Sequence, residues 1–205
     1  MIRVKICGLS REEDIRAVNQ ARPDFIGFVF APSRRQVSFI EAALLKKELD
    51  CSIAVVGVFQ NEDPLRIQQA ICLGLIDLVQ LHGNEDEAYV QWIRRKTGVP
   101  VIKALSVREV TDITRWQNSA ADFLLLDHGA GGSGSSFDWR LARLCKKPFF
   151  LAGGLSPSNV CQAIRETAPY AVDVSSGVET KAQKDENKIL SFIQAVRNYE
   201  TENEV

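Results

Sequence analysis

The strongest constraint on the fold is a series of eight apolar runs of strand length, spaced regularly along the 205-residue chain. They begin at residues 2, 24, 52, 76, 100, 122, 148 and 170, so consecutive runs start 22 to 28 residues apart. Val, Ile, Leu and Phe dominate them, as is typical of strands that are covered on both faces. We therefore predict eight buried strands, over 2–7, 24–30, 52–59, 76–82, 100–106, 122–127, 148–153 and 170–176.

Helical segments fill the intervals between these runs. Ser10 and Glu13 have the spacing of a capping box, and so have Ser38 and Glu41. Ser156 precedes a proline, a pair that favours the start of a helix. Further helices are predicted over 63–73, 84–97, 106–118, 137–146 and 185–199, followed by a frayed tail at about 200–205.

Eight strands that alternate with eight helices indicate parallel βα units. An open doubly wound sheet usually has fewer strands and often a Gly-x-Gly-x-x-Gly turn after the first one, which this sequence lacks. A closed barrel of eight such units can be built from about 200 residues. The predicted fold is α/β, a single (β/α)8 TIM barrel with eight parallel strands and short loops, in one domain spanning 1–205.

Composition excludes several classes of function. The formal net charge of −1 leaves no basic surplus for nucleic acid, and no long apolar stretch predicts a signal peptide or a membrane span. The five cysteines are odd in number and lack Cys-x-x-Cys spacing, so neither a disulfide framework nor a metal site is indicated, and a cytoplasmic location is expected. Packing roles are expected for Cys51, Cys72, Cys145 and Cys161.

Polar and glycine-rich residues follow six of the eight predicted strands. The active site of such a barrel lies at the carboxyl ends of its strands, so this clustering predicts a site there. The residues concerned are Cys7-Gly8, Ser33-Arg34-Arg35, His82-Gly83, Asp127 with the nearby segment GAGGSGSSF, Gly153-Gly154, and Asp173 with Ser175-Ser176-Gly177.

The last two strand ends predict a phosphate site. Glycines let backbone N–H groups approach an anion closely, and a helix N-terminus adds partial positive charge. The loops after strands seven and eight are also the usual phosphate site of these barrels. A simple glycine turn is the alternative for either loop alone. The predicted phosphate-binding residues are Gly153, Gly154, Leu155, Ser175, Ser176 and Gly177.

These motifs together resemble those of phosphoribosylanthranilate isomerase, a barrel enzyme of tryptophan biosynthesis. The matching stretches run in order from residue 5 to 179: KICG, GFVFAPSRR, VGVF, VQLHG, LLLD, GGSGSSFDW, AGGLSPSNV and DVSSGVE. One segment departs from the family. Where members often have Gly-x-Lys-Asp, this chain reads KAQKD at 181–185, which keeps Lys184 and Asp185 and loses the glycine.

The resemblance implies an Amadori rearrangement of N-(5-phosphoribosyl)anthranilate by acid–base catalysis, without a cofactor or a metal. It assigns Cys7 as the general base for the C2′ proton and Asp127 as the general acid for the ring oxygen. It also implies that Arg35 faces the substrate near the anthranilate and that Asp173 contacts sugar hydroxyls. His82 either lines the pocket without transferring the essential proton or is a structural histidine. The implied partner is a small phosphorylated substrate, and the chain is expected to be a monomer or a homodimer.

The two proton-transfer groups need opposite shifts of pKa. A free thiol has a pKa of about 8.5 and an aspartate one of about 3.9, so Cys7 needs help to ionise and Asp127 needs help to stay protonated. Side chains alternate along a strand, so we expect Lys5 to point inward one layer below Cys7 and to pair with Asp173. Its charge would favour the thiolate; a purely structural pair is the alternative.

Other functions stay open at this point. A histidine-pathway isomerase performs a similar rearrangement but uses two aspartates, against which Cys7 argues. Indoleglycerol-phosphate synthase needs a lysine acid, for which Lys103 is the obvious candidate, but the surrounding motifs do not match. A phosphate-binding barrel without catalysis would not need both Cys7 and Asp127.

Overall fold

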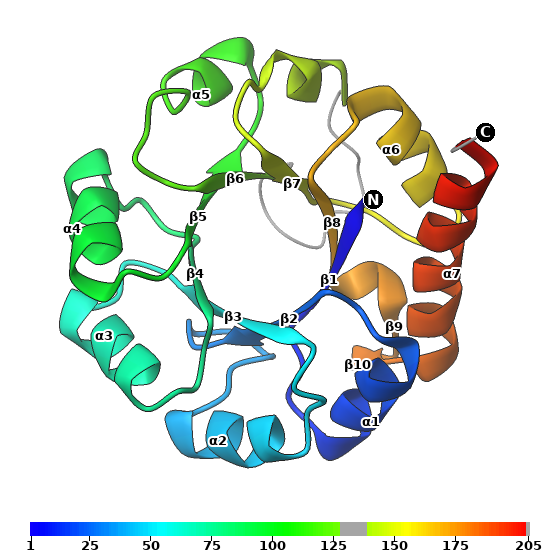
Figure 1. Ribbon diagram of the computed structural model, residues 1–205, viewed down its shortest axis with the longest axis horizontal. Coiled ribbons are helices and arrows are strands. Elements are labelled where there is room, and N and C mark those ends of the chain that lie inside the picture. The colour runs from blue at the N-terminus through cyan, green and yellow to red at the C-terminus, as the bar shows by residue number, and fades with distance from the viewer. Residues whose placement is uncertain (128–138, 204–205) are drawn as a thin grey trace.

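The computed structural model describes residues 1–127 and 139–203. Its eight parallel strands close into a barrel in which each strand pairs with the next and β1 pairs with β8, surrounded by helices (Figure 1). The predicted TIM barrel is therefore confirmed, and every predicted strand is present. The strands are β1 Arg3–Cys7, β2 Phe25–Val29, β3 Ala54–Phe59, β4 Leu78–Leu81, β5 Val101–Ser106, β6 Phe123–Asp127, β7 Phe149–Leu151 and β8 Ala171–Val174.

The outer layer differs from the prediction mainly between β5 and β7. Seven α-helices are present among the described residues, and a 3₁₀ helix, η1 (Trp139–Leu144), stands where an α-helix was predicted over 137–146. The helix predicted over 106–118 is shortened to Val110–Thr114, a segment in which β-branched residues lower helix propensity. The helices are α1 Glu12–Ala21, α2 Phe39–Lys47, α3 Pro64–Cys72, α4 Glu87–Thr97, α5 Val110–Thr114, α6 Val160–Thr167 and α7 Glu186–Asn203.

Two of the three predicted helix starts were wrong. The capping box of α2 is formed by Ser38 and Glu41 as predicted. In α1, however, the carboxylate of Asp14 accepts hydrogen bonds from the N–H groups of Ser10 and Arg11, so that the box begins one residue later than predicted.

Helix α6 begins at Val160 rather than beside the proline that follows Ser156. The side chain of Asn159 accepts a hydrogen bond from the N–H of Ser156 at 2.8 Å and donates one to the carbonyl of Gly154 at 2.9 Å. These bonds fold the intervening residues into a turn, in which an Asn side chain competes with the helix for backbone groups.

The barrel interior and the layer between strands and helices form two separate apolar clusters. The interior one is filled by Phe25, Val56, Leu78, Ile102, Ala104, Leu125, Phe150, Ala152 and Ala171. Charged side chains are also buried in the strands. Lys5 and Asp173 occupy neighbouring positions of β1 and β8, and Lys103 lies on β5. Such groups need partners, and their partners define the site described below.

The four cysteines other than Cys7 only partly fill the packing roles predicted for them. Cys145 and Cys161 are half-buried against the core. Cys51 and Cys72 are exposed, because Cys51 lies in the turn before β3 and Cys72 ends α3 on its solvent side. Helix α7 also runs to Asn203, past the predicted end at 199. No helix among the described residues is long and apolar enough to cross a membrane.

Candidate active site

Cys7 ends β1 with its side chain buried in the mouth of the barrel. Lys5 lies two residues earlier on the same strand and is fully buried, as predicted from side-chain alternation. Its ammonium donates to both carboxylate oxygens of Asp173, at 3.0 and 3.1 Å, across the β1–β8 pairing. The predicted Lys5–Asp173 pair is therefore confirmed in its geometry.

Gly27 is a residue of this site that the sequence argument missed. It pairs with Cys7 in the β1–β2 ladder. A Cβ atom at Gly27 would lie 2.7 Å from the Cys7 sulfur and 3.3 Å from the Lys5 ammonium nitrogen. Any side chain at this position would therefore compete with the thiol and the ammonium for the same space. The signal was present, because a glycine in the middle of a buried strand indicates a close approach.

The pKa of Cys7 shifts in the direction opposite to the one expected. Burial raises the pKa of the Cys7 thiol, and the positive charges of Lys5 and Lys184 oppose this shift without overcoming it. Burial acts to lower the pKa of the Lys5 ammonium, but the charges of Asp173 and Cys7 outweigh it and the pKa is raised. The site thus favours the charged form of Lys5 and disfavours ionisation of the thiol above it.

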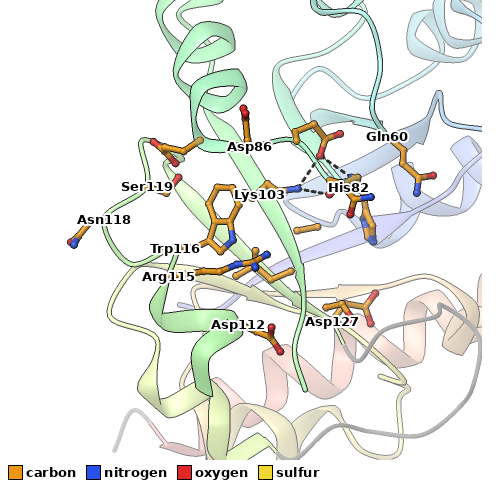
Figure 2. A pocket seen from close by; sticks show the side chains of 17 residues that line it. Gln60, His82, Asp86, Lys103, Asp112, Arg115, Trp116, Asn118, Ser119 and Asp127 are labelled. Carbon is orange, nitrogen blue, oxygen red and sulfur yellow. Dashed lines mark hydrogen bonds and ion pairs between the residues drawn. The ribbon is translucent and has the colours of Figure 1, made fainter. Parts of the chain in front are cut away.

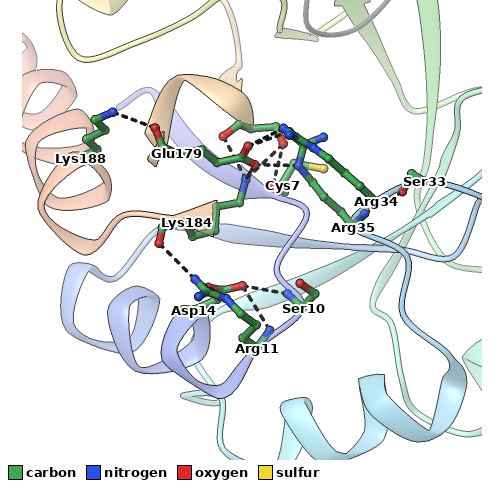
Figure 3. A network of polar contacts seen from close by, with 11 residues as sticks. Cys7, Ser10, Arg11, Asp14, Ser33, Arg34, Arg35, Glu179, Lys184 and Lys188 are labelled. Carbon is green, nitrogen blue, oxygen red and sulfur yellow. Dashed lines mark hydrogen bonds and ion pairs between the residues drawn. The ribbon is translucent and has the colours of Figure 1, made fainter. Parts of the chain in front are cut away.

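A second group of charges surrounds Cys7 at the ends of β2 and β8 (Figure 3). The carboxylate of Glu179, whose side chain is 5% exposed, accepts hydrogen bonds from Arg35 at 2.7 and 3.0 Å, from Arg34 at 2.6 Å and from Lys184 at 2.8 Å. These cations hold the pKa of Glu179 at about 2, against the effect of burial, which would raise it. Glu179 lies on the short strand β9 (Glu179–Thr180) and Lys184 on its partner β10 (Gln183–Lys184).

The side chain of Arg35 passes directly over the turn that follows Cys7. Gly8 has φ +82°, and a Cβ atom there would lie 2.4 Å from Cδ of Arg35. Glycine is therefore needed at position 8 both for the left-handed backbone and for the passage of the arginine. The passage of Arg35 over the turn therefore explains why a glycine follows Cys7.

Asp127 and His82 line a cavity of about 890 Å³ at the ends of β4, β5 and β6 (Figure 2). Asp127 is the last residue of β6, the strand end at which it was predicted, and it pairs with Ser106 of β5. Loss of hydration lowers the pKa of His82, while the negative charge of Asp127 acts to raise it. Nδ1 of His82 lies 2.8 Å from the side-chain nitrogen of Gln80, so His82 is a neutral ring with a fixed orientation at neutral pH.

The loop that carries His82 is tied down by a buried ion pair between Lys103 and Glu85. The ammonium donates to Glu85 at 2.9 Å and to the carbonyl of Gly83 at 2.7 Å. The same carboxylate accepts from the N–H groups of Gly83 and Asn61, at 2.9 and 2.7 Å. The lysine that a lyase would need as its acid is therefore engaged in holding a loop, which argues against that alternative.

The two predicted phosphate loops lie against each other. Gly153 and Gly154 adopt φ of 85° and 67°, and a Cβ atom at Gly177 would lie 1.8 Å from the carbonyl oxygen of Leu155. Ser176 and Gly177 form the 3₁₀ turn η2 (Ser176–Val178). The glycines thus permit a contact between the two loops that no other residue would allow.

Ser175 links these loops to the thiol. Its hydroxyl donates to the carbonyl of Cys7 at 2.9 Å, and the Lys184 ammonium donates to the carbonyl of Ser175 at 3.0 Å. The structure therefore brings Cys7, Asp173 and the loop after β8 into contact. The predicted segment GAGGSGSSF, next to Asp127, lies outside the described residues.

Comparison with known proteins accounts for this constellation. The profile of the N-(5′-phosphoribosyl)anthranilate (PRA) isomerase family matches residues 4–195. The chain belongs to this family. Curated isomerases of that name from Endomicrobium trichonymphae and Streptococcus gordonii are 44% and 45% identical to it over 202 and 201 residues, covering 97% of this chain and 100% and 99% of theirs.

Solved phosphoribosylanthranilate isomerases have the same fold as this member of the family. The enzyme from Thermotoga maritima has a TM-score of 0.88 and 39% identity, over 97% of this chain and 100% of its own. A phosphoribosylanthranilate isomerase in complex with reduced 1-(o-carboxyphenylamino)-1-deoxyribulose 5-phosphate has a TM-score of 0.86 and 37% identity, with the same coverage. The resemblance found in the sequence motifs is thereby confirmed along the whole barrel.

Proposed function

We propose that this chain converts N-(5-phosphoribosyl)anthranilate into 1-(2-carboxyphenylamino)-1-deoxyribulose 5-phosphate in tryptophan biosynthesis, with Cys7 as general base and Asp127 as general acid. Membership of the isomerase family carries the reaction. The observation that supports the residue roles is the placement of a thiol and a carboxyl group at the ends of two strands, β1 and β6, that face one barrel mouth. A reaction with two proton transfers needs two such groups on different sides of the substrate.

In the first step Asp127 donates a proton to the furanose ring oxygen. The bond between that oxygen and C1′ breaks, and the lone pair of the anthranilate nitrogen forms the C1′=N bond of a protonated Schiff base. In the second step the Cys7 thiolate removes the C2′ proton, the electron pair of that bond forms the C1′=C2′ double bond, and the π pair of C1′=N returns to the nitrogen and neutralises it. The resulting enolamine becomes the ketone when its enol proton is replaced by one at C1′.

The positive charge of the Schiff base favours ionisation of the Cys7 thiol. Burial keeps the pKa of Cys7 raised, against the charges of Lys5 and Lys184. An iminium cation formed beside the thiol adds a third positive charge, and opposite charges at short range favour ionisation. The base therefore becomes effective when the acidic C2′ proton is present.

The remaining assignments follow the layout of the site. The loops at Gly153–Leu155 and Ser175–Gly177 would hold the phosphate through backbone N–H groups, supported by their mutual contact. Asp173 would meet the sugar hydroxyls while paired with Lys5, and His82 would line the pocket as a neutral hydrogen-bonding group. Arg35 would meet the anthranilate.

The assembly and the location of the chain are proposed on the same basis. A Thermotoga maritima relative is described as a dimeric enzyme from which monomers were made, so a monomer or a homodimer is expected here. All five cysteines are free, which suits a reducing cytoplasm. Sedimentation equilibrium measures the assembly directly.

The test is the loss of fluorescence of freshly made phosphoribosylanthranilate, run beside the histidine-pathway aminoaldose as a second substrate. Cys7→Ser and Asp127→Asn should each lower kcat by about 100-fold or more, because general acid–base groups contribute on that scale. Both variants should still bind the reduced product. Cys72→Ser, which alters an exposed thiol on α3, should retain full activity. Near-normal kcat in folded Cys7→Ser would show that the base is another group.

A further inference from the structure

Arg35 is held in place by a carboxylate that belongs to the opposite end of the chain. Glu179 accepts from Nε and Nη2 of Arg35, at 2.7 and 3.0 Å, so it occupies one side of the guanidinium. A guanidinium has five N–H groups in a planar fork. The two on Nη1 and the second one on Nη2 have no partner among residues 1–127 and 139–203 and lie on the outer edge, which is the geometry that a second carboxylate can bind in a bidentate manner.

Glu179 is itself fixed by two further cations, one of which shares the carboxylate oxygen Oε1 with Arg35. The Lys184 ammonium, whose side chain is 2% exposed, donates to Glu179 at 2.8 Å and also to the carbonyl of Ser175 at 3.0 Å. Lys188 donates to the backbone carbonyl of Glu179 at 2.7 Å. The carboxylate therefore has little freedom to follow Arg35 if the arginine moves.

The charges around Glu179 do not cancel. Arg34, Arg35 and Lys184 all contact this one carboxylate, which leaves the cluster with an excess of two positive charges. Such an excess favours a bound anion. The phosphate loops are a separate feature of the site, so the outer edge of Arg35 is the place for a different anionic group of the substrate.

We propose that Glu179, anchored by Lys184, is a positioning residue that holds Arg35 with its outer edge free for the carboxylate of the anthranilate ring. This inference rests on the proposed function, which places the anthranilate at Arg35. The opposing reading is that Glu179 competes with the substrate for the arginine. The two readings differ in sign: loss of a positioning carboxylate weakens substrate binding, whereas loss of a competitor strengthens it.

The experiment compares Glu179→Gln, Arg35→Ala and the double variant. For Glu179→Gln we expect KM to rise about tenfold, the scale on which charge-assisted pairs act, with a smaller change in kcat. In the Arg35→Ala background the same substitution should change KM little, because Glu179 acts through Arg35. Glu13→Gln is the matched control: it makes the same substitution in an exposed glutamate that pairs with Arg16 on α1, and KM should change by less than about twofold.

A binding measurement separates positioning from a general loss of structure. The reduced product is compared by calorimetry with its phenylamino analogue, which lacks the ring carboxylate. Glu179→Gln should weaken binding of the reduced product about tenfold and leave that of the analogue unchanged. Equal weakening of both ligands, or an unchanged or lowered KM, overturns the proposal.

The same cycle distinguishes failure of the inference from failure of the proposed function. If Arg35→Ala leaves the affinity for the reduced product unchanged, the assigned role of Arg35 is wrong. If Arg35→Ala weakens binding and Glu179→Gln does not, only the positioning role is wrong. Should Glu179→Gln fail to fold, Glu179→Asp takes its place: it keeps the charge but shortens the reach to Arg35, and the same rise in KM is expected.

Discussion

Ala182 occupies a backbone conformation that suits glycine, and replacing it with glycine should stabilise the protein. It lies in the two-residue turn between β9 and β10, where φ is +49° at Lys181 and +64° at Ala182. Such a turn requires φ > 0 at both central positions and normally selects Asn-Gly. This is the segment in which the chain departs from its family by lacking a glycine, so the hairpin is retained at the cost of a strained alanine.

The expected gain follows from two opposing effects. A left-handed conformation costs an L-residue about 1–2 kcal/mol, which Ala182→Gly removes. Glycine has greater backbone freedom in the unfolded chain, which offsets about 0.4–1 kcal/mol of this. Because Ala182 is exposed, no packing is lost. The net gain is about 1 kcal/mol, which corresponds to a rise in Tm of about 2–4 °C for a chain of this length.

Calorimetry or thermal unfolding by circular dichroism measures this change. Ala168, which ends α6 with φ +47°, offers a second site of the same kind, and Ala168→Gly should also raise Tm. Ala43 lies inside α2, where Ala43→Gly should instead lower stability by about 1 kcal/mol. A Tm for Ala182→Gly that is unchanged, or lowered as for Ala43→Gly, would refute the reasoning.

Two further predictions concern the site. Gly27→Ala should fold but lose most of kcat, because its Cβ would lie 2.7 Å from the Cys7 sulfur. Steady-state kinetics measure this loss. A fully active variant would mean that the thiol has room to move. The pKa of Glu179 is lowered from 4.5 to about 2, so its contribution to stability is complete above pH 4.5 and is lost as the pH falls toward 2. The difference in unfolding free energy between wild type and Glu179→Gln, from urea curves, should therefore shrink by about 2 kcal/mol between pH 6 and pH 3; a pH-independent difference would contradict the ion pairing.

The helix starts show where local sequence is insufficient. Glu13 and Asp14 both have carboxylates close to the start of α1, and sequence spacing favoured the former. The structure uses Asp14, whose side chain is only 2% exposed, because α1 must also bury Ile15 and Val18 against the barrel. Burial of one helix face thus decided between two caps of similar quality.

The sequence by itself determined the barrel and the two candidate proton-transfer groups. Strand positions follow from local apolar runs, and in a parallel barrel the end of each strand is also the edge of the active site. Cys7 and Asp127 could therefore be placed without knowing any contact between distant residues, and so could the alternation that buries Lys5.

Only the tertiary structure decided what surrounds those groups. Arg35 and Glu179 are 144 residues apart and meet because the hairpin after β8 contacts the residues that follow β1 and β2. Gly27 makes room for Cys7 only through the register of two strands. The raised pKa of Cys7 is the balance of two effects: burial, which removes water from the thiol, and the charges of the nearby cations. Both effects depend on all the residues around the barrel mouth, so no local stretch of the sequence predicts their balance.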